Sequence, residues 1–108
     1  MEANAFNIHT LEDRSMVNDI IRTIGSEQII AYENWLKSED RSLGTIEKYT
    51  RDITRLSVWL GNKNITKENL NGWKEHLLSS GLSPVTVNSM LAVANSYCRF
   101  LGLNVKIK

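Results

Sequence analysis

Basic side chains recur at helical spacing in the middle of this 108-residue chain. Lys48, Arg51 and Arg55 are three and four residues apart, so in a helix they would lie beside one another on one face. Arg41 comes just before this group. Adjacent cations can neutralise the phosphates of a nucleic-acid backbone, and Arg and Lys can also pair with guanine edges. A solvated face that only keeps a protein soluble would have the same spacing, so both interpretations stay open.

Polar side chains that are small or carry an amide follow Pro84 in the last quarter of the chain. Asn can pair with adenine, and Ser or Thr can contact phosphates or bases. Ser83 is expected to cap a helix that starts at Pro84. Thr86 lies in the first turn, where free backbone N–H groups favour an anion, and it either supports the cap or contacts a ligand.

Charge is distributed unevenly along the chain, although the net charge is only +1. Residues 1–40 contain eight acidic and three basic side chains, whereas residues 41–63 contain five basic and two acidic ones. Residues 82–108 contain Arg99, Lys106 and Lys108 and no acidic residue. Such segregation can produce a basic face on a nearly neutral protein, and it can also arise by chance in a short chain.

Apolar residues follow helical spacing, and no run alternates long enough to predict a sheet. A weaker leading helix is predicted over residues 15–24, and Ser26 could cap the next, whose buried stripe is Ile29, Ile30, Tyr32, Trp35 and Leu36. Further helices are predicted over 43–60, from a cap at Thr66 to Gly81, and over 84–101. The three tryptophans and the tyrosines are expected in the core. The sequence therefore predicts an all-α fold of four helices plus a short leading one.

The segments 42–61 and 83–102 resemble each other at a constant offset of 41 residues. Ser42 matches Ser83, Thr45 matches Thr86, and Leu-Gly ends both segments. Two copies are too few for a solenoid, so we expect a compact bundle in which both helices present a matching face. The candidate contacts for an anionic polymer are Arg41, Thr45, Lys48, Arg51, Arg55, Thr86, Asn88, Ser89, Asn95, Arg99, Lys106 and Lys108.

Several other classes of chemistry find no support in the sequence. Cys98 is the single cysteine, and with two distant histidines it does not make a metal site. No Gly-rich phosphate loop and no nucleophile with a neighbouring base are present, so no catalytic residue, metal or cofactor is expected. No run of apolar residues could span a membrane and the N-terminus is unlike a signal peptide, so a cytoplasmic location is expected.

The segment from about Ile29 to Leu103 resembles the core-binding, SAM-like N-terminal domain of tyrosine recombinases, the phage-integrase family. LGTIEKYTRDITRLSVWL resembles that family's T-x-x-x-Y-x-x-D-[IL]-x-x-[LF]-x-x-[WF]-L helix, and the Ile-Thr-x-Glu start, the Gly-Leu-Ser turn and the closing Phe-Leu helix follow in order. Gly44 departs from the pattern, because relatives often carry a polar or basic residue there.

The resemblance implies a SAM-like orthogonal bundle over residues 26–103 that clamps one face of duplex DNA at a recombination site, while a separate catalytic domain clamps the other. It also implies other recombinase protomers as partners and no small-molecule substrate. The catalytic Arg, His and Tyr set of such an enzyme is not expected within this chain, so residues 104–108 are interpreted as the start of a linker to that domain. Residues 1–25 are unassigned.

Two other functions remain open from the sequence. SAM-like bundles can also serve as protein–protein interaction modules, and the face over residues 88–99 would then dock a helix. A helix-turn-helix regulator is a weaker third candidate, because the long pair of helices over 66–101 lacks the short pair and tight turn of that motif. The dependence of DNA binding on salt separates the first two functions.

Overall fold

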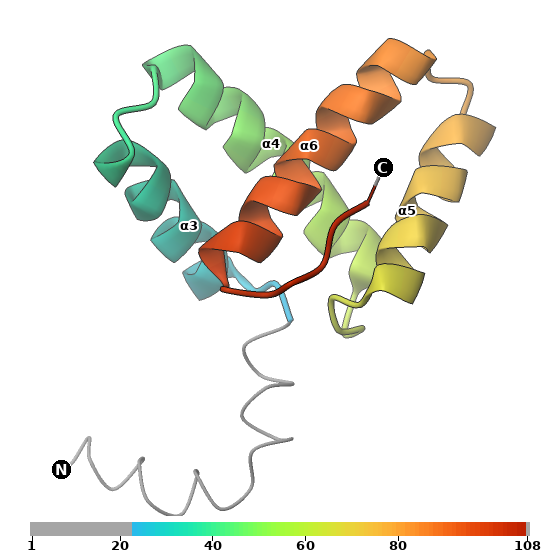
Figure 1. Cartoon of the computed structure of the whole chain (residues 1–108), viewed down its shortest axis with the longest axis horizontal. Helices are drawn as coiled ribbons and strands as arrows, with labels where there is room; N and C mark the ends of the chain where they lie inside the picture. Colours follow the sequence, from blue (N-terminus) through green and yellow to red (C-terminus); the bar gives the residue numbers. More distant parts are fainter. Residues whose placement is uncertain (1–22, 108) are drawn as a thin grey trace, which may run out of the picture.

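The computed structural model of the chain describes residues 23–107. Within this range it contains four helices and no strand, namely α3 (Ser26–Ser38), α4 (Leu43–Leu60), α5 (Lys67–Ser79) and α6 (Pro84–Phe100). Helix α4 packs against the other three, and it crosses α6 at the centre of the molecule (Figure 1). The all-α, four-helix prediction is confirmed. The leading helix predicted over 15–24 lies outside the described residues, apart from its last two positions.

Helices α4 and α6, which contain the two similar segments, begin in the same way. The Ser42 hydroxyl accepts a hydrogen bond from the Thr45 N–H at 3.2 Å and donates one to the Thr45 hydroxyl at 2.9 Å. The Ser83 hydroxyl makes the corresponding bonds to Thr86 at 3.2 Å and 3.0 Å. The backbone angles of the two cap residues agree within two degrees. The repeat found in the sequence is therefore a repeat of local structure, and the capping role of Ser83 is confirmed.

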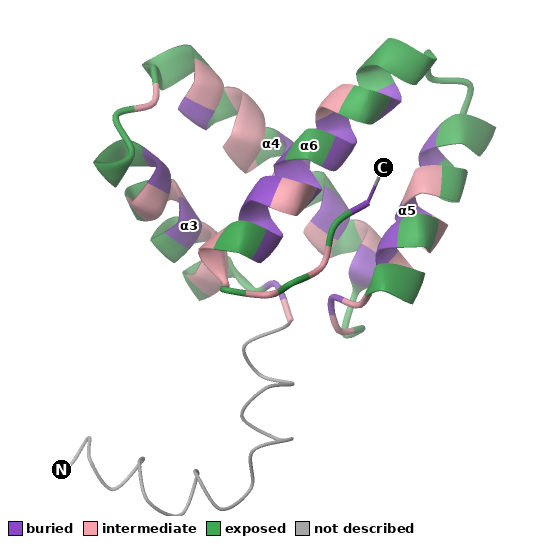
Figure 2. Cartoon of the chain, in the orientation of Figure 1, coloured by how far each residue is buried: buried purple, intermediate pink, exposed green. Residues whose placement is uncertain are grey.

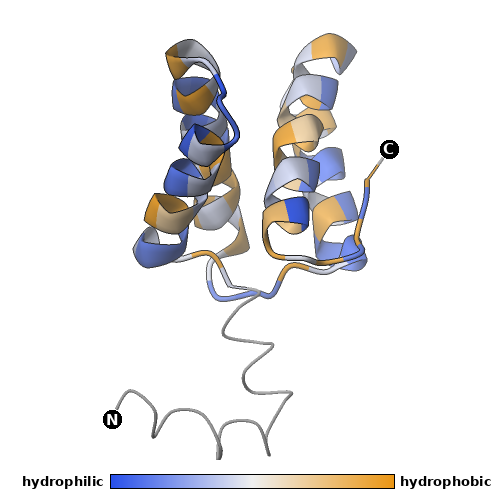
Figure 3. Ribbon diagram, turned by 60° about the vertical axis from the view of Figure 1, so that its left-hand side comes forward, coloured by the Kyte–Doolittle hydropathy of each residue, from blue (hydrophilic) through white to orange (hydrophobic). Residues whose placement is uncertain are grey.

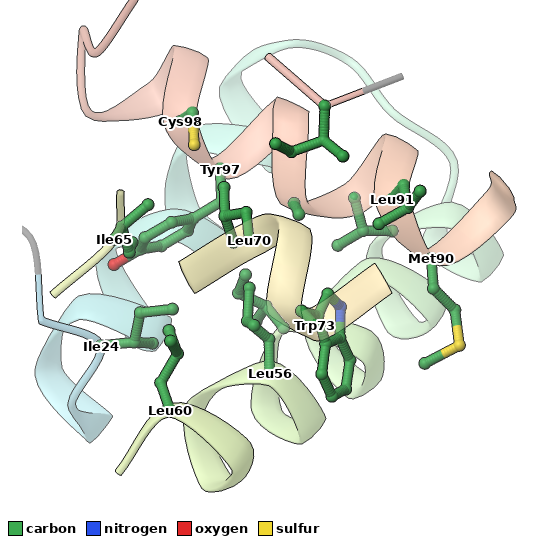
Figure 4. Close-up of a cluster of buried hydrophobic side chains, with 14 of the residues drawn as sticks. Ile24, Leu56, Leu60, Ile65, Leu70, Trp73, Met90, Leu91, Tyr97 and Cys98 are labelled. Atoms are coloured by element: carbon green, nitrogen blue, oxygen red, sulfur yellow. The ribbon is translucent and has the colours of Figure 1, made fainter. Parts of the chain in front are cut away.

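The core is one contiguous cluster of apolar side chains drawn from all four helices, as the purple inner faces in Figure 2 show. Leu56, Leu70 and Trp73 meet the side chains of α6 in its centre (Figure 4). Full burial of a leucine side chain contributes roughly 1.5–3 kcal/mol to folding. Of the three tryptophans expected in the core, Trp73 is buried, whereas Trp35 and Trp59 are half-buried against it.

A buried polar contact joins α3 to α6. The Tyr32 hydroxyl donates a hydrogen bond of 2.8 Å to the Ser96 hydroxyl, and both residues are buried. Burial raises the pKa of Tyr32 to about 12, because the phenolate would lose its hydration. The Tyr32 ring also packs edge-on against Tyr97, with ring centroids 5.1 Å apart. This contact selects one relative placement of the two helices, since a shift would leave the two hydroxyls without partners.

Two details of the predicted first stripe are wrong. Ile30 is 59% exposed, because it lies about 100° around the helix from Ile29 and away from the face that Tyr32 and Leu36 bury. The N-cap of α3 is Gly25 instead of Ser26, which is the first helical residue. The Gln28 side chain accepts a hydrogen bond from the Gly25 N–H at 2.9 Å and so closes this end.

Candidate nucleic-acid interface

A hollow of about 400 Å³ lies between α4 and α6, and we call it the α4–α6 groove. The α4 side of the groove contains the three cations that share one face of that helix. The α6 side contains the small polar side chains that follow Pro84, so two sets of residues that are distant in the sequence face one hollow. The lining residues are Lys48, Arg51, Asp52, Arg55, Val85, Thr86, Ser89 and Met90.

The lining of the α4–α6 groove carries three cations against one carboxylate. Arg51, Arg55 and Thr86 are exposed, whereas Lys48 and Ser89 are partly buried. The two arginines are one helical turn apart, so their guanidinium groups can approach the same length of a polyanion. Thr86 and Ser89 are short, and their hydroxyls can donate to phosphate oxygens without blocking access to the groove.

Asp52 was not among the candidate residues, yet it forms the buried end of the groove's one ion pair. Its side chain is 5% exposed and binds the Lys48 ammonium group one turn earlier in α4. The spacing of four residues between a lysine and an aspartate was the signal in the sequence. Lys48 is thus held against α4 by a carboxylate, and Arg51 and Arg55 carry the more accessible charge.

Lys48→Met should lower the free energy of unfolding by about 1–2 kcal/mol, because it leaves a buried carboxylate without its cation. Asp52→Asn added to Lys48→Met should recover part of this loss. Arg51→Met is the matched control on the same helix, and its effect should stay within about 0.5 kcal/mol since Arg51 is exposed. Urea denaturation of the four proteins measures these values. Equal stability of Lys48→Met and Arg51→Met would show that the ion pair does not support the fold.

Arg41 lies just before the cap of α4, and Thr45 lies in the first turn of this helix. The Arg41 guanidinium lies 5.7 Å from the centre of the Tyr49 ring, and the Lys48 ammonium lies 6.0 Å from the same centre. Tyr49 was expected in the core, and it is half-buried against it. The same ring also lies within cation–π distance of Arg41 and Lys48. Arg41 and Lys48 therefore both lie near the Tyr49 ring, and together they extend the basic surface toward the start of α4.

The remaining candidates are not brought into the α4–α6 groove. Asn88 is exposed on α6, and Lys108 lies outside the described residues. Asn95, Arg99 and Lys106 border a separate hollow of about 240 Å³ near the C-terminal end of the described chain. The Arg99 guanidinium also lies 6.0 Å from the Trp35 ring centre. The structure therefore places some of the predicted residues at the α4–α6 groove and others at this second hollow, whereas Asn88 lines neither.

An apolar hollow of about 440 Å³ adjoins the α4–α6 groove and shares Arg55 and Met90 with it. Trp59, Trp73 and His76 form a cluster of rings with centroids 5.6–5.8 Å apart along this hollow. Trp59 and Trp73 were both expected in the core, and this surface was not predicted from the sequence. Trp59 is half-buried and faces both the core and the hollow.

The described residues contain neither a membrane-spanning helix nor a metal-binding cluster. None of the four helices has both the length and the apolar character to cross a bilayer. No three His, Cys, Asp or Glu side chains within residues 23–107 come together to hold a metal ion. The fold and its clustered charge define an all-α bundle whose two equivalent helices enclose a basic groove.

The family model described as the phage integrase N-terminal SAM-like domain matches residues 29–103 of the chain. This match spans all but the first three helical residues of α3 and extends past the end of α6. The chain therefore belongs to the phage integrase N-terminal SAM-like family, the N-terminal domain of tyrosine recombinases. No match was found among curated proteins or among solved structures.

Proposed function

We propose that this chain is the core-binding domain of a tyrosine recombinase and that it binds duplex DNA through the α4–α6 groove. The observation that carries the proposal is the meeting of Arg51 and Arg55 with Thr86 and Ser89 in one hollow. Exposed arginines neutralise phosphates, and short hydroxyl side chains allow the backbone to approach closely. Family membership supports the same function, since a DNA recombination domain needs a surface of this charge.

The proposed binding is mainly to the phosphate backbone, with limited reading of bases. Arg51 and Arg55 can reach phosphates or guanine edges, whereas Asp52 is buried and engaged with Lys48. The domain would hold the duplex recombination site in position for integration or excision, and it would break no bond itself. The catalytic Arg, His and Tyr residues would belong to another part of a longer enzyme. That enzyme would act in the cytoplasm together with other protomers, and it would take no small-molecule substrate.

A salt titration of binding to duplex DNA tests this function. The logarithm of the association constant should fall linearly with the logarithm of salt concentration, with a slope of about −2 to −4 if two to four phosphates are neutralised. The affinity should depend only weakly on DNA sequence, because backbone contacts dominate. Fluorescence anisotropy with a labelled duplex measures both quantities. A slope near zero, or no binding at low salt, would exclude this function for the groove.

A protein–protein interaction module is the second candidate, and the apolar hollow is the observation that favours it. Val58 borders this hollow and is 78% exposed, and Leu82 borders it and is 37% exposed. Exposed apolar patches of this kind often mark sites where other proteins bind. Binding at that surface would depend little on salt, so the titration described above separates the two functions.

A further inference from the structure

The last described residues fold back along α6 instead of leaving the domain (Figures 1 and 3). Apolar Leu103, Val105 and Ile107 alternate with polar Asn104 and Lys106. Successive side chains of an extended chain point to opposite sides. The burial follows that alternation, because Ile107 is 3% exposed and packs into the core, whereas Asn104 and Lys106 are exposed. We call residues 103–107 the C-terminal strap.

Asn95 of α6 holds the end of this strap by both ends of its side-chain amide. Its Nδ2 donates a hydrogen bond of 2.8 Å to the carbonyl oxygen of Ile107. The N–H of Ile107 donates one of 2.8 Å to Asn95 Oδ1. A neutral amide can give and accept in this way, whereas a carboxylate can only accept. The contact therefore requires an amide, or another group that can both donate and accept, at position 95.

We propose that Asn95 is a positioning residue that binds the backbone of Ile107 and makes the C-terminal strap part of the folded domain. Asn95 was predicted as a contact to DNA, but pairing with an adenine through both an N–H and the oxygen of this amide would compete with the two bonds to Ile107. Arg99 and Lys106 border the same hollow as Asn95. We call the two hydrogen bonds between Asn95 and Ile107 the clamp. The clamp sets the direction of the chain at Ile107 and therefore the position of Lys106 relative to Arg99, whether or not the α4–α6 groove binds DNA.

The clamp acts against chain entropy. Ordering a five-residue segment at the edge of a domain is unfavourable, and the burial of Ile107 and the two hydrogen bonds offset that cost. Loss of one such hydrogen bond should raise the open population of the strap roughly fivefold to tenfold. Opening would expose Ile107 and release Lys106 from its place beside Arg99.

Hydrogen exchange of the unmodified 108-residue chain gives the first test. The side-chain amide of Asn95 should exchange more slowly than the side-chain amide of Asn104, which is exposed in the same segment. The backbone amide of Ile107 should also be protected. Nuclear magnetic resonance resolves all three signals in one sample. Exchange of the Asn95 side chain as fast as that of Asn104, or an unprotected Ile107 amide, would overturn the proposal without any substitution.

Asn95→Asp gives the second test, with Asn104→Asp as the matched control. At neutral pH the introduced carboxylate can accept from the Ile107 N–H but opposes the Ile107 carbonyl, so protection of the Ile107 amide should fall roughly fivefold to tenfold. The neutral carboxyl can donate to the Ile107 carbonyl oxygen and the ionised form cannot, so the state of the contact depends on the pKa of the introduced group. The clamp should then be present at low pH and be lost as pH rises through that pKa.

The charged side chains that border the same hollow are Arg99 and Lys106, and both are present in the two variants. Protection of the Ile107 amide is measured relative to the unmodified chain at each pH. A loss that grows with pH in Asn95→Asp but not in Asn104→Asp supports the clamp. A pH-independent loss, or the same protection in both variants, would contradict it.

Discussion

Replacing Arg51 and Arg55 together by glutamate should weaken binding to duplex DNA by roughly 100-fold or more at low salt. Both side chains are exposed in the α4–α6 groove and face Thr86 and Ser89 across it. The double substitution removes two phosphate contacts and adds repulsion between the groove and the polyanion. The dependence of binding on salt should decrease in parallel, by about two in the slope. Fluorescence anisotropy over a series of salt concentrations measures both effects.

The matched control replaces Lys37 and Lys67 by glutamate, which changes the net charge of the chain by the same amount. Both residues are exposed and lie outside the groove, on α3 and α5. Their replacement should reduce affinity by less than about threefold, because neither side chain lines the groove and salt weakens the longer-range effect of their charge. If both double variants weaken binding equally, overall charge rather than the α4–α6 groove determines affinity.

Ile53→Ala should lower the free energy of unfolding by about 2–5 kcal/mol. Ile53 lies in the middle of α4, has no exposed surface and belongs to the core cluster. Because α4 packs against all three other helices, a cavity there loosens the whole domain. Folded domains of this size are stabilised by only about 5–15 kcal/mol, so the loss is a large share of the total. Denaturation in urea measures the loss.

Val58→Ala is the matched control for Ile53→Ala, since it also truncates an aliphatic side chain of α4. Val58 is 78% exposed, and its replacement should change stability by less than about 0.5 kcal/mol. An equally large effect of the two substitutions would show that the assigned inner face of α4 is wrong. DNA binding by Val58→Ala should be unchanged if the apolar hollow takes no part in it.

The all-α fold could be predicted because its signals are local. Ser42 and Ser83 each reach the backbone three residues ahead, and the apolar stripes of α4 and α6 follow from the spacing of residues along one helix. Gly61 and Gly102 end the two copies with positive φ, which a residue without a Cβ adopts at little cost. The error at Ile30 has the same origin, because a stripe read from the sequence has no partner helix to define its edge.

The candidate site could be predicted only in part. Lys48, Arg51 and Arg55 share a face because of helix geometry alone, and the structure places that face beside Thr86 and Ser89. Nothing in the spacing of Asn95 distinguished a ligand contact from a bond to the backbone of Ile107, twelve residues later. Asp52 carried an i, i+4 signal, but its burial depends on the helix that covers it.

Hydrogen bonds and side-chain periodicity within one helix depend on residues three or four apart, so the sequence alone determined the helices, the caps of α4, α5 and α6, and the charged face of α4. The crossing of α4 and α6 depends on contacts between residues about 40 positions apart, and many crossings would bury the same stripes. Tertiary packing therefore decided that Arg51 and Arg55 share a groove with Thr86 and Ser89, and that Asn95 turns to the strap instead.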